Sequence, residues 1–196
     1  MKNLVIKSAM LIILVLFFGC SSDDSSESCT PIACKNGGVF LNCACDCPQG
    51  YTGSDCSQFI TPSSIRIHKL TIIKFPAFNA NGQLWDNDLI GNSQKADIYV
   101  KMANAEGMII NEDGNAFDNA DPNTPYTYIV SPYKTINSVS LPIVLQLYND
   151  NVSDADELMM QASFQLYTQN QSFDNIIEFS NTSGTFKFQF EVTYTW

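Results

Sequence analysis

Residues 186–196 read Phe-Lys-Phe-Gln-Phe-Glu-Val-Thr-Tyr-Thr-Trp. Apolar and polar side chains alternate strictly along the whole stretch, which is the pattern of a β-strand with one buried face and one solvated face. Ser183-Gly184 has the composition of a turn, and residues 176–179 form an apolar run before it. This end of the sequence therefore predicts two β-strands joined by a turn.

Working back toward the N-terminus, the same patterns predict further strands at residues 65–75, 98–102, 126–130, 143–148 and 160–167. The alternation in 65–75 changes phase near Lys69, which predicts a β-bulge. No stretch shows a convincing helical period. Strands separated by loops rich in Gly, Pro, Asn and Asp predict a mainly β protein, in which residues 57–196 form an antiparallel β-sandwich.

The N-terminus has the features of a targeting segment. Lys2 and Lys7 flank an apolar run at residues 9–18, which is too short to span a bilayer and suits the core of a signal peptide. The run ends in Gly19-Cys20, and a small residue before a cysteine resembles the cleavage box of bacterial lipoproteins. That resemblance implies a signal peptide at residues 1–19 and acyl chains on Cys20. The alternative is an ordinary secretory signal with a chance cysteine.

Residues 20–28 are small, polar and acidic, so they are predicted to form a disordered tether. They also resemble the export signal of Bacteroidota surface lipoproteins, which implies lipid anchoring in the outer membrane, with the protein on the cell surface. The periplasmic face is the alternative. Without residues 1–19 the chain has 8 Lys and Arg against 20 Asp and Glu, a net charge of −12. This charge disfavours nucleic acid and anionic lipid as partners, because both need a basic protein surface.

Six of the seven cysteines lie within residues 29–56, and none follows. In an exported chain this density indicates a disulfide framework that stands in for a hydrophobic core. Six cysteines allow 15 pairings, so the spacing alone leaves the connectivity open. A zinc site is the alternative, since Cys-Ala-Cys-Asp-Cys at 43–47 is rich in thiols, but an oxidising compartment favours disulfides.

Two stretches of this segment, Cys34-Lys35-Asn36-Gly37-Gly38 and residues 47–56 (Cys-Pro-Gln-Gly-Tyr-Thr-Gly-Ser-Asp-Cys), resemble the epidermal-growth-factor-like (EGF-like) module. The resemblance implies the bridges Cys29–Cys43, Cys34–Cys45 and Cys47–Cys56. Only Ala44 separates Cys43 from Cys45, so the central hairpin of the module is expected to be nearly absent. The acidic run of the calcium-binding subtype is also missing, so no metal is expected in residues 29–56.

Two acidic loops interrupt the predicted sandwich, at residues 79–97 and 149–157. Residues 96–101, Ala-Asp-Ile-Tyr-Val-Lys, are similar to the Ser-Asp-Pro-Tyr-Val-Lys stretch of the C2 (C-two) family of calcium- and phospholipid-binding β-sandwiches. Residues 147–151, Leu-Tyr-Asn-Asp-Asn, with the acids that follow, resemble the second acidic loop of that family.

The C2 resemblance implies a weak calcium site at the tip of the sandwich. The implied ligands are Asp86 or Asp88 with Asp97 from the first loop, and Asn149, Asn151 and Glu157 from the second. Asparagines replace two of the family's aspartates, so the site loses charge and its affinity should fall toward the range of extracellular modules. The alternative is that these are solvated loop acids without an ion. A third acidic loop, between Glu112 and Pro125, is compatible with turns alone and is assigned no function.

Groups suited to catalysis are few. His68 is the only histidine, no nucleophile-elbow or phosphate-loop motif is present, and the remaining cysteines are expected to be bridged. These features favour a non-enzymatic surface protein whose sandwich loops bind an unknown protein or glycan partner. One alternative is an accessory subunit of an outer-membrane assembly. Another is a calcium-assisted carbohydrate-binding module, in which Trp85, expected to be exposed in its loop, would stack on a sugar.

Overall fold

The computed structural model describes residues 29–86, 94–151 and 155–196. The predicted signal peptide, Cys20 and the predicted tether lie outside the described residues, as does Asp88. Residues Ile32–Trp196 form one compact unit, and residues 29–31 are the described part of a second one. Over the described ranges, no helix is long and apolar enough to cross a membrane.

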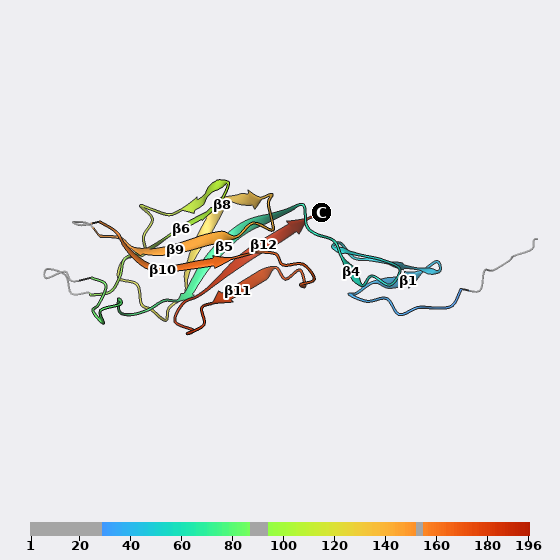
Figure 1. Ribbon diagram of the computed structural model, residues 1–196, viewed down its shortest axis with the longest axis horizontal. Coiled ribbons are helices and arrows are strands. Elements are labelled where there is room, and N and C mark those ends of the chain that lie inside the picture. The colour runs from blue at the N-terminus through green and yellow to red at the C-terminus, as the bar shows by residue number, and fades with distance from the viewer. Residues whose placement is uncertain (1–28, 87–93, 152–154) are drawn as a thin grey trace, which may run out of the picture. The chain divides into compact units, whose positions relative to one another are not determined.

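The regular structure of the described residues is entirely β, and Figure 1 shows its strands in chain order. The strands of the disulfide-rich segment (residues 32–59) are β1 (Val39–Leu41), β2 (Ala44–Asp46), β3 (Tyr51–Thr52) and β4 (Gln58–Phe59). The strands of the larger β-region are β5 (Ser64–Lys74), β6 (Ile98–Asn104), β7 (Gly107–Asn111), β8 (Tyr126–Ile136), β9 (Ile143–Asn149), β10 (Glu157–Phe164), β11 (Ile176–Ser180) and β12 (Lys187–Thr195).

The larger region is a sandwich of two antiparallel four-stranded sheets, which confirms the predicted fold class. Their strand orders are β10-β9-β6-β7 and β11-β12-β5-β8. The alternation at residues 186–196 has the predicted consequence, because Phe186, Phe188, Phe190 and Val192 are all buried. They pack in one apolar core with Leu70 and Ile72 of β5, Val100 and Met102 of β6, and Leu145 and Leu147 of β9. Full burial of each such side chain contributes about 1.5–3 kcal/mol.

The predicted bulge in β5 is confirmed. The register of β5 against β8 shifts between Ile67 and Lys69, and its register against β12 shifts between Glu191 and Val192. Without the shift, residues three apart would face opposite sides of the sheet. With it, Ile67 and Leu70 both face the core and are fully buried.

Three strands differ from the prediction. β7 (Gly107–Asn111) was not expected from its short sequence, and it forms a hairpin with β6 through a turn that ends at Gly107, where φ is 134°. β10 spans Glu157–Phe164 rather than residues 160–167. β8 runs past Pro132 to Ile136, whereas the predicted strand stopped at residue 130. β8 is an edge strand, and an edge strand tolerates proline because the N–H that proline lacks need not bond to a neighbouring strand.

The expectation that the disulfide-rich segment has almost no central hairpin is wrong. β1 and β2 pair with Leu41 opposite Ala44, and the turn between them consists of Asn42 and Cys43. Both turn residues have positive φ, 49° and 66°, which is the backbone of a two-residue type I′ hairpin. Because this turn needs only Asn42 and Cys43, the hairpin forms with the single residue Ala44 between Cys43 and Cys45.

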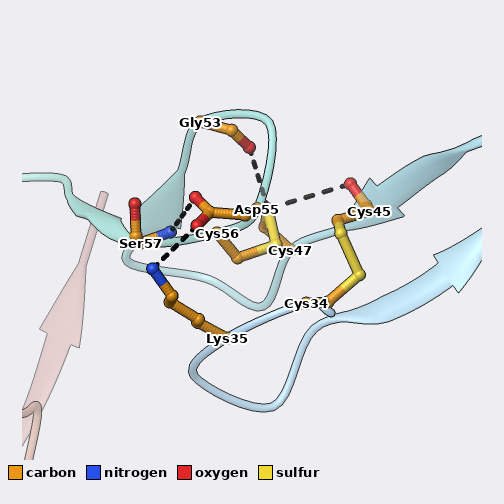
Figure 2. Close-up of a disulfide and its surroundings, with 8 residues drawn as sticks. All are labelled: Cys34, Lys35, Cys45, Cys47, Gly53, Asp55, Cys56 and Ser57. Atoms are coloured by element: carbon orange, nitrogen blue, oxygen red, sulfur yellow. Dashed lines mark hydrogen bonds and ion pairs between the residues drawn. A yellow bond between two sulfur atoms is a disulfide. The ribbon is translucent and has the colours of Figure 1, made fainter. Parts of the chain in front are cut away.

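Two of the three predicted bridges are confirmed. Cys34 is bonded to Cys45 and Cys47 to Cys56, and Cys29 and Cys43 are disulfide-bonded as well. Figure 2 shows the first two bridges beside an ion pair between Lys35 and Asp55, at 2.9 Å. Hydrogen bonds from Ser57 and Lys35 lower the pKa of Asp55 to about 2. The segment is therefore held by covalent links and surface polar contacts, as its lack of a core requires.

Candidate functional site

Chain segments far apart in the sequence meet at one end of the sandwich. β6 and β9 run antiparallel with Ile98 opposite Asn149, so the start of β6 lies beside the end of β9. Asp97 precedes β6, Asn151 follows β9, and Asp86 comes from the connection between β5 and β6. We call these residues, together with residues 117–120, the loop cluster.

Asn149 is the hub of the loop cluster. Its side chain is 0% exposed, and each of its polar atoms is hydrogen-bonded. The amide oxygen accepts a hydrogen bond from the backbone N–H of Asp97 at 2.8 Å. The amide nitrogen donates to Asp86 Oδ1 at 2.8 Å and to Asn151 Oδ1 at 3.0 Å. One buried side chain thus joins three segments, because an amide offers an acceptor and two donors in fixed directions.

The neighbours of Asn149 determine which way its amide points. A backbone N–H can only donate, so the atom that faces Asp97 N must be the amide oxygen. The NH₂ group therefore faces the carboxylate of Asp86. An NH₂ group in this position links two oxygen acceptors, as a bound cation would. The carbonyl oxygen of Asn149 is already engaged and points toward an N–H group.

Residues 117–120 of the third acidic loop also belong to the cluster, although the sequence assigned them no function. Phe117 forms a β-bridge with Ile98, and the N–H of Ala120 donates to the carbonyl of Ala96 at 2.7 Å. Between them, the N–H of Asn119 donates to Asp97 Oδ1 at 2.6 Å. Asn119 has a φ of 54°, which asparagine tolerates better than most residues. The only signal in the sequence was this asparagine, because the contact itself uses the backbone.

The expectation that Trp85 is exposed is wrong. Its side chain is 9% exposed and packs in the core of the sandwich, and its indole N–H donates to the carbonyl of Pro76 at 2.7 Å. Burial of a large apolar ring is more favourable in free energy than its exposure to solvent, provided that its N–H finds an acceptor. Trp85 instead anchors its loop and so places the next residue, Asp86, beside Asn149.

Further carboxylates surround the hub. Tyr99 donates from its hydroxyl to Asp156 Oδ2 at 2.6 Å, and this hydrogen bond is the main reason why the pKa of Asp156 is lowered. Burial, with the same hydrogen bond, raises the pKa of Tyr99 to about 12. Burial also raises the pKa of Asp150, and the nearby charges of Asp156, Asp113, Asp97 and Asp118 raise it further. Acids outnumber lysines at this end of the sandwich, where Lys95 and Lys101 pair with Asp121 and Asp113. Tyr99, Asp150 and Asp156 lie in the stretches that carried the C2 resemblance, but they were not among its implied ligands.

The structure brings Asp86, Asp97, Asn149 and Asn151 together, as the C2 resemblance implied. Glu157 lies opposite Asn149 in the β9–β10 register and is exposed, and Asp88 is outside the described residues. Among the residues that the structure describes, no group of three or more His, Cys, Asp or Glu side chains could hold a metal ion. Calcium requires six to eight oxygen ligands, whereas Asn149 turns a donor toward Asp86. The side-chain arrangement at the hub does not fit a calcium site.

His68 takes part in structural contacts. Its Nε2 is 3.0 Å from Thr193 Oγ1, and its ring packs at 5.8 Å from the ring of Tyr133. Arg66 lies over the same tyrosine ring at 5.1 Å. These contacts place His68 against polar and aromatic side chains of the sheet that contains β5, β8 and β12.

Comparison with known proteins gives only distant similarity. No protein-family model matches the sequence, and no curated protein matches it either. Solved structures with a similar arrangement include "Structure of a C2 domain", at 12% identity and a TM-score of 0.41, covering 68% of this chain and 98% of that one.

Two further structures are similar at the same level. A C2 domain of plant Extended Synaptotagmin 1 is 14% identical, with a TM-score of 0.36 and coverage of 69% of this chain and 97% of that one. Human GIVD cytosolic phospholipase A2, in complex with an inhibitor and terbium chloride, is 11% identical with a TM-score of 0.34. That match covers 67% of this chain and 17% of the phospholipase. At these TM-scores the similarities assign neither a family nor a function to the chain.

Proposed function

We propose that the chain is a non-enzymatic, lipid-anchored protein of the outer membrane, displayed on the cell surface, which binds a protein partner through the loop cluster. The hydrogen-bonded hub at Asn149 carries the proposal. Loops that are ordered before contact lose less conformational entropy on binding than mobile loops do. The carboxylates around the hub favour a basic surface on the partner, because complementary charge steers association.

Two observations support a binding role rather than catalysis. His68 contacts Thr193 and Tyr133, and neither is a carboxylate that could orient it as a base. All six cysteines of residues 29–56 are disulfide-bonded and are not available as nucleophiles. In this proposal the disulfide-rich segment acts as an EGF-like spacer, and the C2-like sandwich presents the loops.

Site-specific crosslinking on intact cells tests the partner surface. A photoreactive side chain at Asp118, an exposed residue of the loop cluster, should give a discrete protein adduct of defined mass. The same group at Ser180, an exposed residue of β11, is the matched control and should give none. Equal adducts from both positions, or none from position 118, would overturn the assignment of the binding surface.

The anchor rests on the sequence alone, and the Cys20→Ala variant tests it. The wild type should partition with membranes because several acyl chains together give stable attachment, whereas one chain is marginal. The variant should appear in the soluble fraction or keep its signal peptide. A membrane-bound variant with the mature mass of an unacylated chain would contradict the lipoprotein assignment. Surface display is read separately, by external protease before and after replacement of Asp23 and Asp24 by Ala.

The crosslinked product also separates the alternatives. An accessory subunit of an outer-membrane assembly should give one fixed adduct in every preparation, at a constant ratio to the assembly. A free binder should give an adduct that depends on the supply of the partner. The carbohydrate-binding alternative loses the residue that suggested it, because Trp85 is buried, and it would need a different site.

Weak calcium binding, which the C2 resemblance implied, is the rival to this interpretation of the hub. The observation that favours it is the position of Asp150, whose pKa is raised first by burial and then by the charges of neighbouring carboxylates, which a cation would offset. If Asn149 serves as the cation substitute, about 10 mM calcium, which exceeds the roughly 0.1–1 mM dissociation constants of extracellular modules, should leave the melting temperature of the wild type unchanged. Asn149→Asp should make the melting temperature rise with calcium, and adding Asp97→Asn should abolish that rise. A wild-type melting temperature that rises with calcium and is lost in Asp97→Asn would favour the metal site instead.

A further inference from the structure

A cavity lies at the other end of the sandwich from the loop cluster. The register of β5 and β12 pairs Lys74 with Lys187 near one end and Ser64 with Thr195 near the other. Next to the second pair is a cavity of about 500 Å³. Its walls come from three stretches of the compact unit: residues 48–51 of the disulfide-rich segment, residues 172–175 between β10 and β11, and residues 193–196 of β12 and its end.

Aromatic rings make up the apolar part of this cavity. Phe173 is the centre of the group, with its ring centroid 5.0 Å from that of Trp196 in an edge-to-face arrangement. Tyr51 and Tyr194 each contact Phe173 at 5.4 Å. All four side chains are partly exposed, so the rings both pack on one another and face the cavity.

The aromatic wall is held in place by backbone contacts. The indole N–H of Trp196 donates to the carbonyl of Ile60 at 3.1 Å, and the N–H of Ile60 donates to the carbonyl of Gly50 at 2.8 Å. Gly50 has a φ of 88°, and a Cβ there would lie 2.5 Å from a ring carbon of Phe173 and 2.7 Å from one of Trp196. Only glycine permits this close approach of backbone to rings.

Polar groups line the same cavity beside the rings. Asp174 presents a carboxylate that already accepts a hydrogen bond from Ser172 Oγ at 2.7 Å, and this leaves further acceptor sites. Gln49 and Asn175 present exposed amides. No lysine or arginine is among the lining residues, which disfavours phosphate and carboxylate ligands.

We propose that this cavity binds a neutral saccharide. A sugar ring has an apolar face of C–H groups, which suits an aromatic wall, and an edge of hydroxyl groups, which suits a carboxylate and amides. The volume is within the range of small-ligand sites, which hold their ligand between apolar surfaces and a few polar groups. The site is separate from the loop cluster, so a test of saccharide binding is independent of the proposed protein partner.

The chain offers its own reporter for the test. It contains two tryptophans, so the Trp85→Phe variant leaves Trp196 as the sole indole. This variant, with the rest of the chain intact, is titrated to about 10 mM with four neutral probes: the tetrasaccharides of β-1,4-glucose, β-1,4-xylose, β-1,4-mannose and β-1,4-N-acetylglucosamine. That limit detects dissociation constants of about 1 mM or tighter. At least one probe should change the Trp196 fluorescence saturably.

Variants locate the binding. Asp174→Ala should weaken it about tenfold or more, because a charged acceptor is lost. Tyr51→Ala should weaken it as well, through the aromatic wall. Asp46→Asn, an exposed acid outside the cavity, is the matched control and should bind as before. Melting temperatures identify any variant that is misfolded, and calorimetry on the wild type checks the fluorescence. No saturable change with any probe, or equal binding by Asp174→Ala and Asp46→Asn, would overturn the proposal.

Discussion

The disulfide-rich segment and the sandwich reach order by different means within one chain. The segment buries little apart from Gly50 and Cys56, and its strands are two or three residues long. The sandwich contains no cysteine, and it buries a continuous core contributed by both sheets. The difference shows that a short stretch needs cross-links where a long one can use apolar area, because the buried fraction of a chain grows with its length.

The largest effect is expected from a cavity in the sandwich core. Phe190→Ala should lower the free energy of unfolding by about 3–5 kcal/mol, since the ring is fully buried and its neighbours cannot close the space. Urea denaturation followed by circular dichroism measures the change. Ser180→Ala, at an exposed position of β11, should leave the midpoint almost unchanged. A loss below about 1 kcal/mol for Phe190→Ala would mean that the core is loosely packed.

A smaller and more local effect is expected from the removal of one bridge. The double variant Cys47→Ala/Cys56→Ala should destabilise the disulfide-rich segment by about 2–4 kcal/mol, the usual range for a disulfide. Limited proteolysis should then cut within residues 47–59 while the sandwich stays resistant. Ser54→Ala, inside the same bridged loop, is the control. Simultaneous loss of the sandwich would show that the two regions unfold as one unit.

The third-largest effect on stability is expected from the hub of the loop cluster. Asn149→Ala leaves the N–H of Asp97 and the carboxylate of Asp86 without their partner, which costs about 1–3 kcal/mol. Asn151→Ala removes a single hydrogen bond to the hub and should cost less. Both are measured as shifts of the urea midpoint. An equal cost for the two variants would contradict the central position of Asn149.

The smallest effect is the pH dependence of the disulfide-rich segment. The pKa of Asp55 is lowered to about 2, so its contribution to stability is complete above the pKa of an unfolded aspartate, about 3.9. That contribution is lost as the pH falls toward about 2. The side chain of Asp55 is 31% exposed, so solvent screens its charge and the loss should be slight. The NMR signals of residues 34–57, followed from pH 5 to about pH 2 in wild type and in Asp55→Asn, measure it. An identical response in the two proteins would show that Asp55 is not the group responsible.

The sequence predicted the parts of the fold that depend on regular patterns. The alternation at 186–196 located β12 to within a residue, and the change of phase at Lys69 located the bulge. β7 was missed because its residues, Gly-Met-Ile-Ile-Asn, begin with glycine and do not alternate between apolar and polar. The type I′ turn at Asn42 and Cys43 was missed because cysteine is not a residue that usually signals positive φ.

The candidate site was predictable only where side chains carry the contact. Resemblance brought out Asp97, Asn149 and Asn151, which the structure does place together. Asn119 contributes a backbone N–H, which any residue could supply, so its only mark in the sequence is the tolerance of asparagine for positive φ. Trp85 was placed on the surface because it sits in a polar loop, and only the packing of the whole sandwich shows that its ring enters the core.

The hub at Asn149 also resists chemical ageing, because its side chain is buried and the N–H of Asp150, whose nitrogen would attack the amide in deamidation, already donates to the carbonyl of Asp97 at 2.7 Å. Spontaneous deamidation would convert this one amide to a carboxylate and replace its two donors with acceptors. The new charge would face Asp86 and Asn151, and the three segments would lose their common partner. Order at this end of the sandwich therefore depends on one amide that the fold itself protects.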